Sequence, residues 1–276
     1  MTRWQTCLNT STIKTTGILE KIRVTSEAGF DAIELWINDI YEYIGRGGEV
    51  RDIESALGDH GLTVPCMIAL RGWGEAIGPE YRIMLEEARR RMELAARIGA
   101  PLVVATPPRQ SCDLAQLTDR YGDLLQIGRE LGIHPTFEYI SFFQGAQTLD
   151  VAWQVVQNVG EDDATLIADA FHTWNSPSSE KLLKEIPGHR ISHYHIDDGN
   201  PNLPRFQQTD PDRVMIGDGV IDLDAEIEML VEIGYNGMIS LELFNQQLWD
   251  QDPLEVARLG KQRLDALLLS HVKKQS

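Results

Sequence analysis

Short apolar runs rich in β-branched residues alternate with longer amphipathic stretches from one end of the chain to the other. This alternation restricts the possible folds, because strand and helix repeating at roughly 30-residue intervals predict parallel strands joined by right-handed crossovers. We expect strands at Gln5–Asn9, Ala32–Ile37, Thr63–Ile68, Leu102–Thr106, Pro135–Tyr139, Thr165–Asp169, Ile191–His195 and Met238–Leu243.

Helical patterns fill the intervals between these strands. We expect helices at Ile18–Ala28, Val50–His60, Pro79–Ile98, Ala115–Leu131, Leu149–Asn158, Ser179–Ile186, Leu223–Ile233 and Pro253–Leu269. Gly99 and Gly132 each follow a predicted helix, as is usual where a chain leaves a helix to re-enter a sheet. Eight such units favour a closed (β/α)₈ barrel, a TIM barrel, formed by residues 1–276 as a single domain. Gly199–Gly219 lacks periodicity, which predicts a long functional loop.

The composition excludes some classes of function. The formal net charge of −17 disfavours nucleic acid as a partner, because binding to phosphate backbones depends on cationic side chains. No run of about 18 or more apolar residues is present, so we expect no membrane-spanning helix. Cys7, Cys66 and Cys112 are far apart and odd in number, which predicts reduced thiols in a cytoplasmic protein. The oligomeric state is left open, and a homo-oligomer is compatible with the sequence.

Polar side chains end the fifth to eighth predicted strands: Glu138, Asp169, His195 and Glu242. The active site of a TIM barrel lies at the carboxyl ends of its strands. A single glutamate at a strand end is usually a surface charge or a helix-cap partner, but adjacent carboxylates repel one another unless a cation neutralises them. These four residues therefore predict one divalent metal ion: Mn²⁺, Zn²⁺, Co²⁺ or Mg²⁺. His193 faces the same way as His195 and is predicted to be a deeper, hydrogen-bonded core residue.

Other side chains are candidates for contact with a substrate. His172 lies just beyond the sixth strand, where it could bind a substrate hydroxyl or move a proton. Arg213 lies in the long loop, where it could hold a substrate oxygen or pair with Asp212. Glu34 ends the second strand and is a further candidate. Three tryptophans could form apolar walls for a ring-shaped ligand, although packing is the common role of such residues: Trp36, Trp73 and Trp174.

Three stretches in the second half of the chain resemble a known family. They are HYHIDD at 193–198, DRVMIGDGVIDLD at 212–224 and SLELF at 240–244. They are similar to the xylose isomerase-like TIM-barrel superfamily of sugar isomerases and epimerases, and closest to its inosose isomerase (2-keto-myo-inositol isomerase) branch. The resemblance implies that His172 and Arg213 contact substrate and that the metal ligands are Glu138, Asp169, His195 and Glu242. Trp174 stands where that branch tends to carry another histidine.

The resemblance also implies a reaction. An α-hydroxyketone, either a keto-sugar or a cyclic polyol ketone, would react through an enediolate intermediate. Glu138 or Glu242 would remove the proton and the other would return it, while His172 and Arg213 stabilise the developing oxyanion. Dehydration begins with the same proton abstraction, so an inosose or keto-sugar dehydratase with His172 as its acid is an alternative. No basic pocket is visible in the sequence, which favours a substrate without phosphate.

Two further classes of protein are alternatives to an isomerase or dehydratase. An endonuclease IV-like phosphodiesterase shares much of this ligand set, but that branch binds three zinc ions and needs histidines on the third and fourth strands. Residues 64–67 and 103–106 contain none, and Val214 stands where that branch has a loop histidine. A non-catalytic sugar-binding barrel is the other class, and weak metal binding by an intact fold would favour it.

Overall fold

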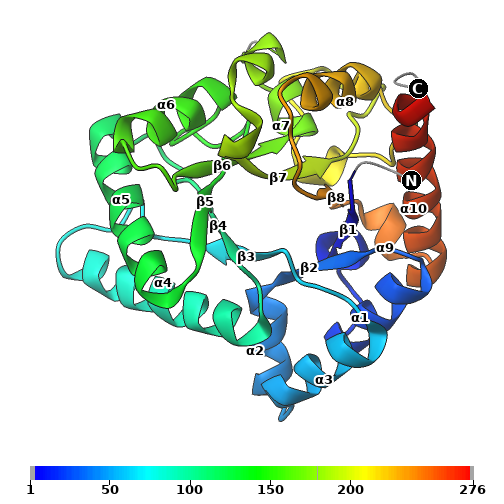
Figure 1. Cartoon of the computed structure of the whole chain (residues 1–276), viewed down its shortest axis with the longest axis horizontal. Coiled ribbons are helices and arrows are strands. Elements are labelled where there is room, and N and C mark those ends of the chain that lie inside the picture. The colour runs from blue at the N-terminus through cyan, green and yellow to red at the C-terminus, as the bar shows by residue number, and fades with distance from the viewer. Residues whose placement is uncertain (1–3, 179, 274–276) are drawn as a thin grey trace.

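The computed structural model describes residues 4–178 and 180–273. Its strands are parallel and form one closed barrel in chain order, with β1 pairing to β8 to complete the circle. Figure 1 shows the barrel end-on, inside a ring of helices. The strands are β1 (Thr6–Asn9), β2 (Ala32–Trp36), β3 (Cys66–Leu70), β4 (Leu102–Ala105), β5 (His134–Phe137), β6 (Thr165–Asp169), β7 (Ile191–Ile196) and β8 (Ile239–Leu241). The predicted TIM barrel is confirmed.

Most predicted helices are present within a few residues of their expected bounds. The helices are α1 (Ile18–Glu27), α2 (Ile37–Gly45), α3 (Val50–His60), α4 (Pro79–Ile98), α5 (Leu114–Leu131), α6 (Leu149–Val159), α7 (Ala170–Trp174), α8 (Leu223–Glu232), α9 (Gln246–Trp249) and α10 (Pro253–Lys273). Short 3₁₀ helices are η1 (Thr10–Ile13), η2 (Glu180–Glu185), η3 (Gly188–Arg190) and η4 (Asp210–Asp212). Gly99 (φ 88°) and Gly132 (φ 70°) adopt the left-handed conformation after α4 and α5, as predicted.

The structure corrects three predictions about helices and strands. The helix predicted at Ser179–Ile186 is the 3₁₀ helix η2, and Ser179 itself lies outside the described residues. Proline follows Ile186, and a residue before proline is disfavoured in the α conformation. The third strand begins after Pro65 rather than at Thr63, because proline has no N–H for the strand ladder. Helix α2 was missed, since its β-branched and aromatic residues continue the strand pattern of β2.

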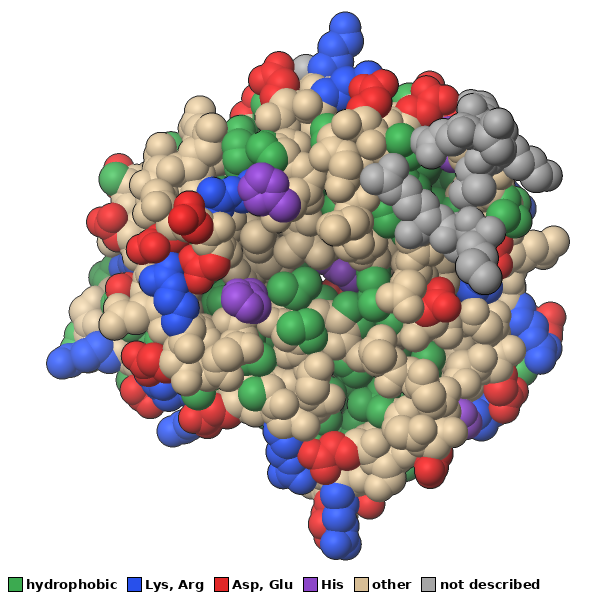
Figure 2. All heavy atoms as spheres, in the orientation of Figure 1, with side chains coloured by type: hydrophobic (Ala, Val, Ile, Leu, Met, Phe, Trp, Pro, Cys, Tyr) green, Lys and Arg blue, Asp and Glu red, His purple; other side chains and the backbone are tan. Residues whose placement is uncertain are grey.

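Apolar residues fill both the barrel and the layer between the barrel and its helices. One buried cluster inside the barrel comprises Cys66, Ile68, Ala69, Val104 and Ile167. A larger cluster joins the strands to the surrounding helices. On the face shown in Figure 2, charged side chains gather mostly around the periphery, while backbone and hydrophobic side chains occupy much of the middle. No helix within residues 4–178 and 180–273 combines the length and the apolar character needed to cross a membrane.

Candidate metal centre

Consecutive strands bring the four predicted metal ligands to the carboxyl end of the barrel. Asp169 is the last residue of β6 and pairs in register with His195 of β7. Glu138 directly follows β5 and Glu242 directly follows β8. All four side chains are buried. The strand order therefore places three carboxylates and one imidazole at the same end of the barrel, as the sequence predicts.

The donor atoms of three of these residues are close enough to share one ion. Nδ1 of His195 lies 3.3 Å from Oε2 of Glu242 and 3.8 Å from Oδ2 of Asp169. A set of one donor atom each from Asp169, His195 and Glu242 lies within 4.8 Å of one another. Among the described residues, this buried nitrogen has no hydrogen-bond partner. An imidazole nitrogen beside two carboxylates suits a borderline or hard divalent ion.

The guanidinium of Arg213 already lies among the same carboxylates. Its Nη1 is 3.1 Å from Oδ2 of Asp169 and 3.1 Å from Oε2 of Glu242, and it also donates to Asp197. Its Nη2 donates to Oδ1 of Asp210 at 2.7 Å. Burial alone would lower the pKa of Arg213, but these carboxylates hold it well above its usual value. One cation among four carboxylates leaves an excess of negative charge, which a divalent ion would offset.

Glu138 and Glu242 are poised to exchange protons near neutral pH. Burial, followed by the charge of Glu242, raises the pKa of Glu138 to about 8. Burial raises the pKa of Glu242 to about 7, against the lowering effects of His195 and Arg213. Within the described part of the chain, no hydrogen bond holds the Glu138 carboxylate, whereas Glu242 accepts from Nδ2 of Asn9 at 2.8 Å. Glu138 is therefore the less constrained of the two carboxylates.

Metal affinity is expected to rise with pH between 6 and 8 in protein treated with a chelator. A metal ion binds the deprotonated carboxylate, while most Glu138 is protonated below its pKa of about 8. Burial alone would lower the pKa of His195, but Glu242 and Glu34 hold it well above its usual value, so this ligand also releases a proton to the solvent. Each proton released contributes up to about a tenfold gain in affinity per pH unit. Calorimetric titration with Mn²⁺ in buffers of different ionisation enthalpy measures the protons released. An affinity independent of pH, with no proton release, would contradict this assignment.

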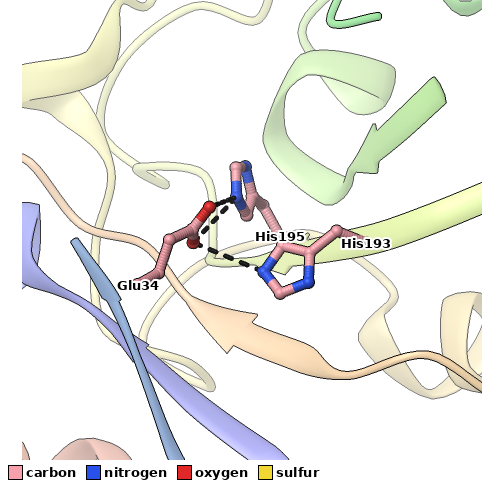
Figure 3. Close-up of side chains that lie close together, drawn as sticks. All are labelled: Glu34, His193 and His195. Atoms are coloured by element: carbon pink, nitrogen blue, oxygen red, sulfur yellow. Dashed lines mark hydrogen bonds and ion pairs between the residues drawn. The ribbon is translucent and has the colours of Figure 1, made fainter. Parts of the chain in front are cut away.

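Glu34 lies behind the candidate ligands and fixes the ring of His195 (Figure 3). Its Oε2 is 3.1 Å from Nε2 of His195 and 3.4 Å from Nε2 of His193, so the two rings of β7 converge on one carboxylate of β2. The same oxygen accepts from Nδ2 of Asn9 at 2.9 Å and from Oγ of Ser240 at 2.8 Å. With Nε2 held by Glu34, the Nδ1 of His195 is directed towards Asp169 and Glu242, as expected for an outer partner of a metal-binding histidine.

A second group of donors, Glu34, His193 and His195, is also compact enough for an ion. Its shared oxygen is already engaged by Asn9 and Ser240. None of its three side chains lines the cavity at this end of the barrel. The group of Asp169, His195 and Glu242 is the better candidate, because Glu242 opens directly onto that cavity.

A Glu34→Gln variant is expected to bind Mn²⁺ about 10- to 100-fold more weakly than the wild type. The amide loses the charge that orients His195, while the shape of the side chain is kept. Calorimetry gives the affinity, and thermal melting in the presence of chelator shows whether the fold is intact. Glu86→Gln, an exposed position on α4, is the matched control. Equal affinities for Glu34→Gln and wild type would remove Glu34 from the metal centre.

A cavity of about 190 Å³ opens beside the ligands, and Glu138, His172, Arg213 and Glu242 all line it. This volume is below the roughly 300–1,000 Å³ of sites for drug-sized ligands, which indicates a small metabolite. Glu34 is not among the lining residues and contacts His195 instead, and its contact with substrate stays a prediction.

The three tryptophans have different positions. Trp36 lines the cavity as predicted. Trp73 is buried in the core with its ring 6.1 Å from that of Phe137, so packing is its role. Trp174 is not among the residues that line the cavity, and Cζ of Arg205 lies 5.4 Å from the centre of its ring. Its contact with substrate stays a prediction.

His172 is fixed as a neutral ring. An arginine can only donate, so Nε2 of His172 accepts from Nη2 of Arg213 at 2.9 Å, while Nδ1 lies 3.2 Å from Oγ of Ser141. Burial lowers the pKa of His172 to about 4, against the raising effect of Asp169. The backbone N–H of His172 donates to Oδ1 of Asp169 at 2.6 Å, so the side chain that caps α7 also belongs to the metal centre.

Sequence reasoning gave no role to Asn9 and Asp197. Asn9 ends β1 and donates to both Glu34 and Glu242. It is a polar residue at the carboxyl end of a strand, which is the criterion that identified the other candidates. Asp197 follows His195 by two residues and accepts from the backbone N–H of Phe171 at 2.9 Å as well as from Arg213. Alternate residues of a strand face the same side, so Asp197 is expected on the same side as His195, and this pattern could have identified it as a site residue.

Comparison with known proteins finds relatives that match most of the chain. The chain is 27% identical to an inosose isomerase of Bacillus velezensis, over 98% of this chain and 99% of that protein. It is 27% identical to a 3-dehydroshikimate dehydratase of Pseudomonas aeruginosa over 85% of this chain, which spans 37% of that longer protein. These relatives are named as enzymes. A crystal structure of the IolI protein with a bound zinc atom superimposes with a TM-score of 0.88 at 24% identity, covering 96% of this chain and 98% of the other.

A family model described as "Xylose isomerase-like TIM barrel" matches residues 22–267. That range includes every candidate metal ligand and the candidate substrate contacts Glu34, His172, Trp174 and Arg213. The resemblance in the sequence motifs is thus confirmed at the level of the family. The chain belongs to the xylose isomerase-like TIM barrel family.

Proposed function

We propose that this protein is a metal-dependent isomerase or epimerase that acts on an α-hydroxyketone, a keto-sugar or a cyclic polyol ketone, through an enediolate intermediate. The observation that carries the proposal is the pair of carboxylates, Glu138 and Glu242, that line one small cavity beside the donor atoms of Asp169 and His195. A carboxylate within reach of a substrate C–H bond can act as its general base. The similarity to an inosose isomerase over nearly the full length of both chains supports the same class of reaction.

Asp169, His195, Glu242 and Glu138 would hold a divalent metal ion. When bound, the ion supplies Lewis-acid polarisation of a carbonyl oxygen, which makes the neighbouring C–H bond more acidic. Asp169, His195 and Glu242 fit this role because their donor atoms lie within 4.8 Å of one another and Nδ1 of His195 has no hydrogen-bond partner among the described residues, while Glu138 lines the adjoining cavity. The IolI protein with its bound zinc atom supports a metal in this fold, and the identity of the ion is left to the binding measurements.

Glu138 would take the proton from the carbon that carries the hydroxyl group. It is free of hydrogen bonds within the described residues, while Glu242 is held by Asn9 and Arg213. Return of the proton by Glu138 to the neighbouring carbon would complete an isomerisation. Return by Glu242 to the original carbon from the opposite face would complete an epimerisation.

Arg213 would bind the substrate oxygen on which negative charge develops, and His172, which accepts from Nη2 of Arg213, would hold that guanidinium in place. The Arg213 guanidinium donates hydrogen bonds in a fixed geometry and is buried, which strengthens its interaction with an oxyanion. His172 has a pKa of about 4 and is neutral at pH 7, so it is a poor source of the proton needed to expel hydroxide. This favours isomerisation or epimerisation over dehydration.

Proton NMR in D₂O tests the proposal with Mn²⁺-loaded protein and 2-keto-myo-inositol. Metal-dependent deuterium uptake at the carbon beside the carbonyl, with a new inosose appearing, is the expected result. The same assay is repeated with linear keto-sugars and with their phosphate esters. Absence of exchange for every α-hydroxyketone, from folded and metal-loaded protein, would refute the proposed function.

A further inference from the structure

Two arginines line the cavity on the side of the barrel away from the metal centre. Arg71 directly follows β3, and Arg109 lies in the loop after β4. In the closed order of strands, β3 and β4 stand across the barrel from β7 and β8, which supply His195 and Glu242. A ligand in the cavity would therefore have Glu242 on one side and the two guanidinium groups on the other, with Glu138, which follows β5, between them in the strand order.

Aromatic rings hold both guanidinium groups in place. Cζ of Arg71 lies 5.2 Å from the centre of the Trp36 ring, and Cζ of Arg109 lies 4.7 Å from that of Phe143. The Trp36 ring is itself fixed, because its Nε1 donates to Oδ1 of Asn9 at 3.0 Å. The Phe143 ring is buried and packs edge-on against Phe142. A cation over an aromatic face at these distances is attracted to it, so the two charges are positioned before a ligand arrives.

Neither guanidinium has an anionic partner among residues 4–178 and 180–273. No hydrogen bond or ion pair of their side chains occurs there, although the chain has 42 acidic residues against 25 basic ones. In the described part of the chain, no ion pair joins either arginine to the lining carboxylates Glu75, Glu138 and Asp210, and Asp210 pairs with Arg213. Partial burial lowers the pKa of Arg71, and the charges of Glu138 and Asp210 oppose this effect. Both arginines are exposed and line the cavity, so their guanidinium groups are open to an incoming anion.

We infer that the substrate carries an anionic group, a carboxylate or a phosphate, and that Arg71 and Arg109 bind it while the α-hydroxyketone faces Glu138 and Glu242. This inference rests on the proposed function for the reacting end of the substrate. Guanidinium groups bind both kinds of oxyanion through paired N–H donors. The sequence favoured a substrate without phosphate because the two arginines lie far apart in the chain and outside any basic run.

Calorimetric binding to the Mn²⁺-loaded protein tests the inference without requiring turnover. Two matched pairs serve as probes: 3-dehydroshikimate with its methyl ester, and fructose 6-phosphate with fructose. In at least one pair, the charged member is expected to bind about 10- to 100-fold more tightly to the wild type. This ratio should fall towards one in Arg71→Met and Arg109→Met. Arg97→Met, an exposed position in the last turn of α4, just before β4 begins at the amino end of the barrel, should keep it.

The outcomes separate the inference from the proposed function. A charge preference in the first pair identifies a carboxylate as the anion, and one in the second pair identifies a phosphate. Equal affinities within both pairs, or a preference that survives in both Met variants, would overturn the inference while proton exchange with neutral ketones still supports the reaction. Charge-dependent binding without exchange for any ketone would instead refute the proposed function. Arg109→Lys, which keeps the charge, should retain part of the preference if a Met variant folds poorly.

Discussion

Glu138→Gln is expected to slow proton exchange about 10²- to 10⁴-fold at saturating Mn²⁺ while the metal remains bound. The amide keeps an oxygen that can face the ion but cannot accept a proton from carbon. Glu138 lines the cavity, and burial raises its pKa to about 8, so its carboxylate is matched to proton transfer near neutral pH. The rate comes from deuterium uptake measured by NMR, and calorimetry on the same sample gives the bound metal.

A Glu242→Gln variant distinguishes the roles of the two carboxylates, Glu138 and Glu242. Glu242 is held by Asn9 and Arg213, so this variant is expected to weaken metal binding more than Glu138→Gln does. Glu86→Gln, on the exposed face of α4, controls for the loss of one negative charge. Full exchange activity in Glu138→Gln at saturating Mn²⁺ would eliminate Glu138 as the base and transfer that role to Glu242.

Arg213→Met is expected to lower the free energy of unfolding by about 3–5 kcal/mol in the presence of a chelator. The substitution leaves Asp169, Asp197 and Glu242 buried without the cation that they contact. Added Mn²⁺ should restore part of the loss, because an ion that binds the same carboxylates favours the folded state. Urea unfolding with chelator and with Mn²⁺ measures both values.

Two controls sharpen this prediction. Arg97→Met breaks an exposed ion pair with Glu54 and should cost less than about 1 kcal/mol. Loss of the Arg213 charge should raise the pKa of Glu242 above its wild-type value of about 7. The cost of Arg213→Met should therefore shrink as the pH falls towards 7, because the carboxyl of the variant is protonated first and then needs no cation. A variant as stable as the wild type in chelator at pH 8 would show that Arg213 does not neutralise this cluster.

The strand ends were predictable from sequence because strand order in a TIM barrel follows chain order. Asp169, His195 and Glu242 could be assigned to one rim without coordinates, and their donor atoms do come together. The distance of each side chain from the cavity was not predictable from the sequence. The alternation of side chains gives the face of a strand, but it does not say that Glu34 reaches sideways to His195 instead of into the cavity.

The loops account for what the sequence could not predict. Gly199–Gly219 has no periodicity, so nothing in it indicated that Arg213 would lie among the metal-centre carboxylates. Arg71 and Arg109 belong to different loops after β3 and β4, and only the closed barrel brings them to the same cavity. Contacts of this kind depend on three-dimensional packing rather than on local spacing.

The hydrogen bond from Asn9 to Glu242 spans 233 residues and joins the first strand to the last. During translation, the ribosome would release β1 long before β8, so Glu242 would reach its partner only after nearly all of the chain had been made. The ligand set is therefore completed by the same event that closes the barrel. A nascent chain that lacks β8 would not assemble this centre, so metal acquisition would follow completion of the fold rather than guide it.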